Sequence, residues 1–83
     1  MPTIEVHLWA GLRPLIEDKE KLTVEATTVG EMLRELVIKH PALKPTIDSG
    51  VSVAIDGRII STNLNESVKP ENEIYLLQKL RGG

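Results

Sequence analysis

The sequence predicts a small α+β domain in which a mixed β-sheet of four or five strands carries one main helix on one face. Two observations lead to this prediction. Apolar and polar residues alternate with a period of two in several short segments, as expected of half-buried strands. One longer segment spaces its apolar residues three and four positions apart, as expected of an amphipathic helix. Because this helix follows the second of five expected strands, it must cover one face of the sheet that they form together.

The first two strands are expected at residues 3–10 and 22–25, where every second residue is apolar. The intervening residues 11–21 hold a glycine, a proline and a run of charges at residues 17–21, and we expect this charge run to be a solvated turn region. A connection of this kind favours an antiparallel hairpin between the two strands.

The helix is expected to begin after Thr28 and to end at His40. Glu31 lies three residues after Thr28, which is the reciprocal capping pattern of a helix start. Pro41 disfavours helical geometry at the residue before it, which sets the end of the helix. The resulting length of about 12 residues is typical. The stripe expected to face the sheet consists of Val29, Met32, Leu33, Leu36, Val37 and His40.

The second half of the chain is expected to supply three short strands, at residues 51–55, 58–60 and 73–77. Asp56-Gly57 is a strong signal for a tight turn between the first two of these strands. Residues 41–50 contain two prolines and a Ser-Gly pair, so they predict a loop with at most a short turn near Leu43 or Ile47.

The segment before the last strand, residues 61–72, is polar and rich in turn-forming residues, and we expect Leu64 and Val68 to anchor it. After the last strand, residues 78–83 are expected to form a flexible tail that ends in Gly82-Gly83. Residues 1–77 then make up the folded domain.

Composition and charge exclude several classes of function. The 83 residues carry a net charge of −2 with a pI near 5.6, which gives no basic field for nucleic acid. The longest apolar runs are far shorter than the roughly 20 residues of a membrane helix, and the N-terminus lacks the pattern of a signal peptide. We therefore expect a cytoplasmic protein. Without cysteine there is no disulfide, thiolate metal site or thiol nucleophile.

Aromatic and histidine residues are scarce. Trp9 and Tyr75 are the only aromatic side chains of the Phe, Trp and Tyr type, which excludes a base-stacking surface and predicts an aliphatic core. His7 and His40 lie on different elements without an obvious carboxylate or cysteine partner. We expect neither of them to bind a metal or to act as a general base.

The order strand, strand, helix, strand, strand, strand fits a β-grasp, and the chain resembles the ubiquitin-like sulfur carriers. That family includes the small subunit of molybdopterin synthase and the thiamin-biosynthesis sulfur carrier. The resemblance rests on residues 51–57 (Val-Ser-Val-Ala-Ile-Asp-Gly), on residues 73–77 (Glu-Ile-Tyr-Leu-Leu) and on Gly82-Gly83. The chain has Glu71-Asn72-Glu73 where many carriers have Gly-Asp-Glu, and Leu80-Arg81 before the glycines resembles the end of ubiquitin itself.

The resemblance implies a reaction at the C-terminus. An adenylating, ubiquitin-activating-like enzyme would consume ATP to activate the Gly83 carboxylate, and sulfur would then replace AMP to leave a thiocarboxylate. Gly82 would allow close approach of the backbone, and an extended tail would reach about 20 Å beyond the sheet. The chain has no phosphate-binding loop of its own. We therefore expect a non-catalytic protein cosubstrate without a bound cofactor, with a sulfur donor and a sulfur-accepting synthase as further partners.

The sheet face away from the helix is a second candidate site. If the alternating aliphatic residues point to the core, then His7, Trp9, Ala54, Tyr75 and Leu77 point outward and could form one apolar docking patch. For Trp9 there is an alternative to a place in this patch: if it lies at the end of the strand, its side chain would fold over the following loop. In the tail, Lys79 and Arg81 project on the same side and Leu80 lies between them. By resemblance, these residues would help the activating enzyme to select the chain.

Three functions remain open at this point. The first is a sulfur carrier for molybdopterin, thiamin or a related thiolation. The second is a ubiquitin-like modifier that is joined to other proteins through Gly83. The third is a β-grasp interaction domain that acts without covalent chemistry.

Overall fold

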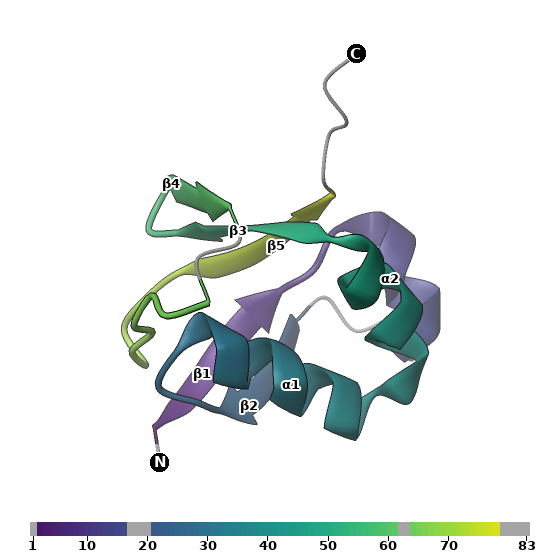
Figure 1. Cartoon of the computed structure of the whole chain (residues 1–83), viewed down its shortest axis with the longest axis horizontal. Helices are drawn as coiled ribbons and strands as arrows, with labels where there is room; N and C mark the ends of the chain where they lie inside the picture. The colour runs from purple at the N-terminus through teal and green to yellow at the C-terminus, as the bar shows by residue number, and fades with distance from the viewer. Residues whose placement is uncertain (1, 17–20, 62–63, 79–83) are drawn as a thin grey trace.

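The computed structural model describes residues 2–16, 21–61 and 64–78, which form a five-stranded mixed sheet with helices packed against it (Figure 1). The order across the sheet is β2-β1-β5-β3-β4. Central strands β1 and β5 run parallel, and every other neighbouring pair is antiparallel. The predicted mixed sheet and its N-terminal hairpin are confirmed. The strands are β1 (Thr3–His7), β2 (Lys21–Glu25), β3 (Val51–Ile55), β4 (Arg58–Ser61) and β5 (Ile74–Gln78).

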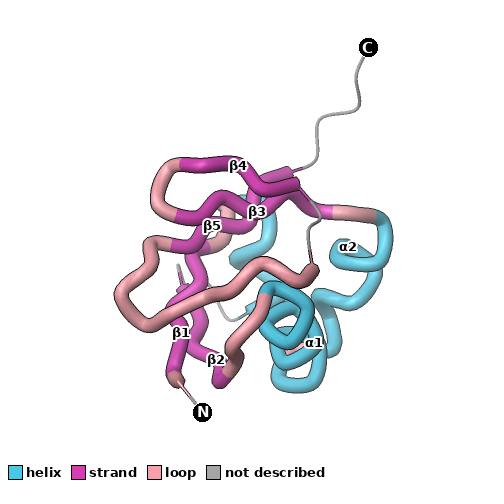
Figure 2. The backbone as a smooth tube through the Cα atoms, turned by 60° about the vertical axis from the view of Figure 1, so that its left-hand side comes forward, coloured by secondary structure: helices cyan, strands magenta, loops and turns pink. Residues whose placement is uncertain are grey.

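The main helix, α1 (Val29–Lys39), and the short helix α2 (Lys44–Ser49) lie together on one side of the sheet (Figure 2). The core between helices and sheet is aliphatic, as predicted, and the described residues bury no polar or charged side chain in it. Val29, Met32 and Leu36 of α1 are fully buried. The strand positions predicted to face inward are all buried as well: Ile4, Val6, Leu8, Val51, Val53, Ile55, Ile74 and Leu76.

The start of α1 is capped as predicted. Thr28 Oγ1 accepts a hydrogen bond from the Glu31 N–H (3.2 Å). The Glu31 carboxylate accepts bonds from the Thr27 hydroxyl (2.6 Å) and the Thr27 N–H (2.8 Å). These bonds hold the pKa of Glu31 below its ordinary value, because they stabilise the charged form of the carboxylate. The bond from the Thr27 hydroxyl has the largest effect.

The segment before β5 is attached to the same helix end, but differently from the prediction. Val68 is buried, as expected, whereas the Leu64 side chain is 53% exposed. The Leu64 main chain makes the attachment: its carbonyl accepts from the Gly30 N–H (3.0 Å), and the Glu66 carbonyl accepts from the Val29 N–H (2.9 Å). The free N–H groups of the first helical turn thus find partners in this segment. A Cβ on Gly30 would lie 3.2 Å from the Leu64 carbonyl oxygen, so this close approach favours glycine.

One predicted boundary in the first half is wrong. The first strand ends at His7, not at residue 10, and a 3-10 helix, η1 (Ala10–Ile16), follows it. The charge run predicted as a solvated turn lies, except for Lys21, outside the described residues. The Leu12 N–H donates to the Trp9 carbonyl (3.0 Å), and this hydrogen bond begins η1. Leu12 and Ile16, four residues apart, are both buried. Their burial stabilises a helix in a segment where the nearby glycine and proline indicate irregular structure.

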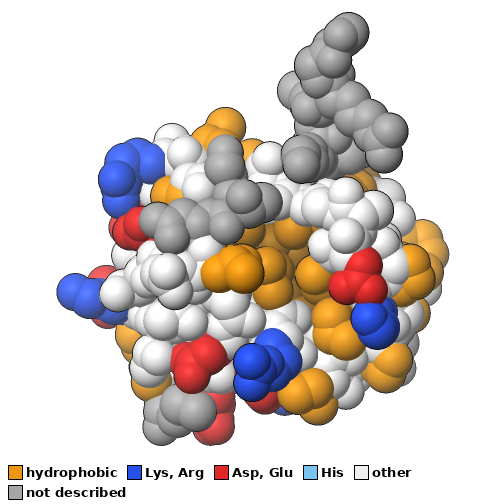
Figure 3. All heavy atoms as spheres, in the orientation of Figure 1, with side chains coloured by type: hydrophobic (Ala, Val, Ile, Leu, Met, Phe, Trp, Pro, Cys, Tyr) orange, Lys and Arg blue, Asp and Glu red, His pale blue; other side chains and the backbone are white. Residues whose placement is uncertain are grey.

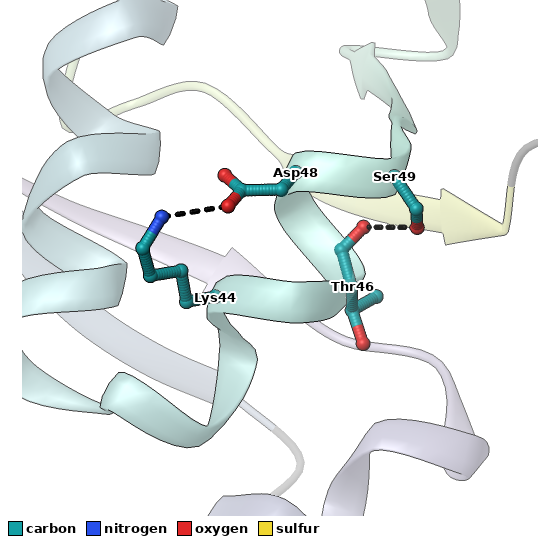
Figure 4. Close-up of polar contacts among 4 residues, drawn as sticks. All are labelled: Lys44, Thr46, Asp48 and Ser49. Atoms are coloured by element: carbon teal, nitrogen blue, oxygen red, sulfur yellow. Dashed lines mark hydrogen bonds and ion pairs between the residues drawn. The ribbon is translucent and has the colours of Figure 1, made fainter.

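The expected loop at residues 41–50 is also helical, with the 3-10 turn η2 (Pro41–Leu43) leading into α2. Its prolines sit in the first turns, where a missing N–H costs nothing. Lys44 and Asp48 form an exposed ion pair one turn apart (2.6 Å), and the Ser49 hydroxyl donates to the Thr46 carbonyl (2.9 Å) (Figure 4). The short turn predicted near Leu43 or Ile47 is present as η2 and α2, and Leu43 is fully buried.

Candidate functional site

Strand register places a row of residues across the sheet face that points away from α1, called the outer face below. His7 lies opposite Tyr75, Tyr75 opposite Ala54, and Ala54 opposite Ile59. Because directly opposed residues share a face, all four lie on the outer face. Leu77, two residues after Tyr75 on β5, lies on the same face. These five residues are called the outer patch.

The outer patch is apolar and partly exposed. Tyr75 is 41% exposed and Ile59 is 65% exposed, while His7 and Leu77 are half-buried. The rings of His7 and Tyr75 stack, with centroids 4.6 Å apart and an angle of 21° between planes. This stacking fixes the aromatic ring on the surface and lowers the entropy that a partner would have to remove on binding.

Ala54 corrects one detail of the prediction. It lies on the outer face as expected, but it is only 8% exposed. Tyr75 and Ile59, which have larger side chains, lie opposite it on the two neighbouring strands. Ala54 therefore forms the floor of the patch, and Ile59, which the sequence analysis missed, forms its exposed rim. The sequence Arg58-Ile59-Ile60 does indicate an outward-facing isoleucine, because adjacent residues of a strand face opposite sides of the sheet.

The other half of the outer face is polar. Thr3, Glu5, Lys21, Thr23 and Glu25 of β1 and β2 are all exposed there, and Lys21 pairs with Glu5 (3.4 Å). The apolar residues thus gather over β5, β3 and β4 only.

On the face drawn in Figure 3, charged side chains lie singly or beside a charge of opposite sign and form no continuous basic area among the residues described.

Trp9 does not join the outer patch. It lies beyond the end of β1, is half-buried, and packs against the core. A Cβ on Gly11 would lie 2.8 Å from the indole Nε1, so the ring covers the glycine at the start of η1. This is the placement over the loop that the sequence left open as the alternative.

The tail begins where β5 ends. Gln78, the last residue of β5, is opposite Val51 in the sheet. The residues predicted to react or to guide the activating enzyme, Lys79, Leu80, Arg81, Gly82 and Gly83, lie outside the described residues, so their roles remain predictions. The described part of β5 nevertheless carries Tyr75 and Leu77 directly upstream of them.

The described residues form neither a metal site nor a membrane-spanning helix. Within residues 2–16, 21–61 and 64–78, no group of three His, Cys, Asp or Glu side chains could hold a metal ion. His7 stacks on Tyr75, and His40 caps the far end of α1. Among the same residues, no helix has the length and apolarity needed to span a membrane.

The sheet order, with its parallel central pair and α1 across one face, defines a ubiquitin-like β-grasp protein. Within that class the chain belongs to the ThiS family, whose family model matches residues 6–83. A comparison with curated protein sequences gives no match.

Solved structures of similar fold cover nearly the whole chain. Small archaeal modifier protein 1 of Methanosarcina acetivorans is 28% identical, with a TM-score of 0.81 and coverage of 100% of this chain and 98% of that one. Its Haloferax volcanii counterpart is 26% identical, with a TM-score of 0.76 and coverage of 98% and 99%. A complex of subunits 1 and 2 of the molybdopterin-converting factor from Helicobacter pylori 26695 contains a chain that is 25% identical, with a TM-score of 0.65 and coverage of 98% and 99%.

Proposed function

We propose that this protein is a sulfur carrier whose Gly83 carboxylate is adenylated by a partner enzyme and converted to a thiocarboxylate. One observation carries the proposal: β5, the strand with Tyr75 and Leu77 on its outer face, leads directly into the Gly82-Gly83 tail. A partner that binds the outer patch would therefore receive the tail nearby. Membership of the ThiS family and the similarity to a subunit of a two-protein complex support the same function.

The chemistry needs an external source of activation, because a carboxylate is a poor electrophile at neutral pH. In the proposed sequence, a Gly83 carboxylate oxygen attacks the α-phosphorus of ATP and pyrophosphate leaves. A hydrosulfide equivalent from the sulfur donor then attacks the acyl carbon, and AMP departs with the bonding electrons. On the synthase, the thiocarboxylate sulfur attacks an electrophilic carbon of the acceptor and displaces the group that this carbon carries. Water then cleaves the acyl–sulfur bond, which restores the Gly83 carboxylate and leaves the sulfur on the acceptor. The chain itself supplies the reacting carboxylate and the docking surface, and it performs no catalysis.

Intact mass spectrometry tests the carrier reaction. We expect the protein, incubated with its activating enzyme, ATP and a sulfur donor, to gain the mass difference between sulfur and oxygen. Alkylation of the thiocarboxylate should then add one label. The matched control is a chain that lacks Gly82-Gly83, which should stay unchanged. If the full chain also remains an unmodified carboxylate under these conditions, the carrier function is wrong.

Docking on the outer patch has its own test. Ile59→Asp places a charge on the exposed rim of the patch, and we expect it to raise the KM of the activating enzyme for this chain by about tenfold, equivalent to about 1.4 kcal/mol. Thr3→Asp adds the same charge to the polar half of the same face and should leave KM within about twofold. Equal effects of the two variants would contradict docking on the outer patch.

A second function is favoured by the two similar archaeal structures, which are named as protein modifiers. Conjugation through Gly83 would replace sulfide by a lysine amine as the group that attacks the activated acyl carbon. Trypsin cuts after Arg81, so each conjugate would leave Gly82-Gly83 on the modified lysine. Proteomics of the host with and without the gene therefore separates the two functions. Gene-dependent Gly-Gly remnants on many lysines would establish the modifier, and their absence together with sulfur at Gly83 would leave the carrier.

A further inference from the structure

Strand β2 is an edge of the sheet whose outer side is paired with no other strand in the part of the chain that the structure describes. The Ala26 N–H donates to the Pro2 carbonyl (3.1 Å), which continues the register of β1 and β2 by one pair. In an antiparallel ladder, alternate residues bond to the same neighbour. Leu22 and Val24 therefore bond to β1, and Lys21, Thr23 and Glu25 direct their N–H and C=O groups to the free edge.

A side-chain hydrogen bond at this free edge agrees with that assignment. The Thr23 carbonyl accepts a hydrogen bond from Lys39 Nζ (3.1 Å), which reaches across from the end of α1. Lysine is a common protection against unwanted pairing at sheet edges, and here its ammonium group covers a carbonyl that no strand pairs with. Lys39 therefore covers the centre of this edge, and a strand that pairs with β2 has to displace the ammonium group from the Thr23 carbonyl.

Two shallow hollows between β2 and α1 lie on either side of Lys39. One has a volume of about 270 Å³ and is lined by the carboxylates Glu25 and Glu35. The other has a volume of about 310 Å³ and is lined by Lys21 and His40. The edge thus has an acidic end and a basic end, with Thr23 between them.

We propose that β2 pairs antiparallel with β2 of a second copy of this chain, about a two-fold axis at Thr23. The sequence of β2, Lys-Leu-Thr-Val-Glu, has opposite charges at its two ends. Antiparallel pairing about Thr23 sets Lys21 opposite the partner's Glu25, and Glu25 opposite the partner's Lys21. Each of the outward-directed residues then exchanges two main-chain hydrogen bonds with its opposite number.

Charge selects this register. Opposite charges directly across a strand pair are stabilising, and like charges are destabilising. Parallel pairing in register would place Lys21 beside the partner's Lys21, and a shift of two residues would remove both Lys–Glu pairs. On the helix side, the same two-fold axis brings the acidic hollow of one copy toward the basic hollow of the other. The resulting interface is self-complementary, as two-fold symmetry requires.

The dimer would leave the outer patch and the end of β5 free. Strand β2 is at one edge of the sheet, whereas the outer patch lies over β5, β3 and β4, with only His7 on β1. Each dimer would therefore present two tails and two patches. This inference does not depend on the proposed function, because it concerns a different edge of the sheet.

A charge-swap experiment tests the pairing. Lys21→Glu leaves two acidic residues on the edge, and Glu25→Lys leaves two basic ones. In sedimentation velocity over a concentration series, the unmodified chain should show a monomer–dimer equilibrium, and each variant alone should dimerise at least about tenfold more weakly. An equimolar mixture of the two variants should form a heterodimer, because every cross-strand pair is then Lys–Glu. Circular dichroism and thermal melting of each variant establish that it is folded.

The matched control uses Lys69→Glu and Glu71→Lys, two exposed positions in the segment before β5, whose mixture should associate no more than the unmodified chain. A further variant, Lys39→Ala, frees the Thr23 carbonyl and should tighten the dimer several-fold. The proposal is overturned if the Lys21→Glu and Glu25→Lys mixture stays monomeric while both variants are folded. It is equally overturned if the unmodified chain is monomeric throughout, or if it dimerises with no response to these variants.

Discussion

Asp56 links the β3–β4 turn to the start of β5, and its replacement gives the sharpest test of how the central strand is held in place. One carboxylate oxygen accepts from the Glu73 N–H (2.8 Å), and the other accepts from the Asn72 side-chain amide (2.7 Å). The Asp56 N–H donates to the Glu73 carbonyl (2.8 Å). Asp56 also has a φ of 51°, followed by 84° at Gly57. Both values are positive, as the tight hairpin turn requires.

The cost of Asp56→Ala follows from these contacts. Two side-chain hydrogen bonds at about 1 kcal/mol each are lost, and alanine in the left-handed region costs a further 1–2 kcal/mol or so. We expect the free energy of unfolding to fall by about 3 kcal/mol and the Tm by roughly 15 °C, given about 4–8 °C per kcal/mol for a domain of this size. Asp56→Asn keeps an acceptor and a residue type that tolerates positive φ, so its cost should stay near 1 kcal/mol.

Asp56→Gly separates the two contributions. It loses the same hydrogen bonds as alanine but adopts positive φ freely, so it should be more stable than Asp56→Ala by about 0.5–1 kcal/mol despite its more flexible unfolded chain. Urea denaturation of all three variants measures the order Asn, Gly, Ala from least to most destabilised. If alanine costs under 1 kcal/mol, or if glycine is as damaging as alanine, the reasoning about bonds and backbone at Asp56 is refuted.

Three further predictions follow. Leu36→Ala opens a cavity beneath α1, where Leu36 is fully buried, and should lower the free energy of unfolding by roughly 2–5 kcal/mol in denaturant melts; a cost under 1 kcal/mol would contradict this packing. Deletion of Gly82-Gly83 should abolish modification by the activating enzyme while it changes unfolding by no more than about 0.5 kcal/mol, and a larger loss would show a packed tail. Because the folded-state pKa of Glu31 is lowered, its stabilising effect is complete above its ordinary pKa of 4.5 and is lost as the pH falls through the lowered value. The stability difference between the unmodified chain and Glu31→Gln should therefore shrink in acid, and Thr27→Val should remove most of that pH dependence; a constant difference would contradict the assigned hydrogen bonds.

The sheet and α1 were predictable because their signals are local and agree with one another. Alternation in each strand fixes which residues face the core, and a one-residue slip would expose all of them. The Thr28 and Glu31 pair marks the helix start, and Pro41 marks its end. These features depend on neighbouring residues alone, so no knowledge of tertiary contacts was needed.

The missed elements depend on contacts that are distant in sequence. Gly11 and Pro14 indicate a break in structure, but burial of Leu12 and Ile16 against the core overrides that local preference. Leu64 resembles a hydrophobic anchor, yet the segment is held by main-chain bonds to the N–H groups at the start of α1. Burial and main-chain pairing of this kind cannot be read from composition.

The same distinction applies to the outer patch and to the choice between carrier and modifier. His7 and Tyr75 were identified from alternation, whereas Ile59 became visible only when β4 was placed in register with β3. The five residues after Gln78, fully extended, span at most about 18 Å, so a partner that reacts with Gly83 must also lie close to the end of β5. An activated acyl group accepts either sulfide or an amine, and the proposed chemistry contains nothing within this chain that prefers one of them. The selection must therefore come from the partner that occupies the surface within reach of the tail, and the outer patch is the apolar surface that shares β5 with it.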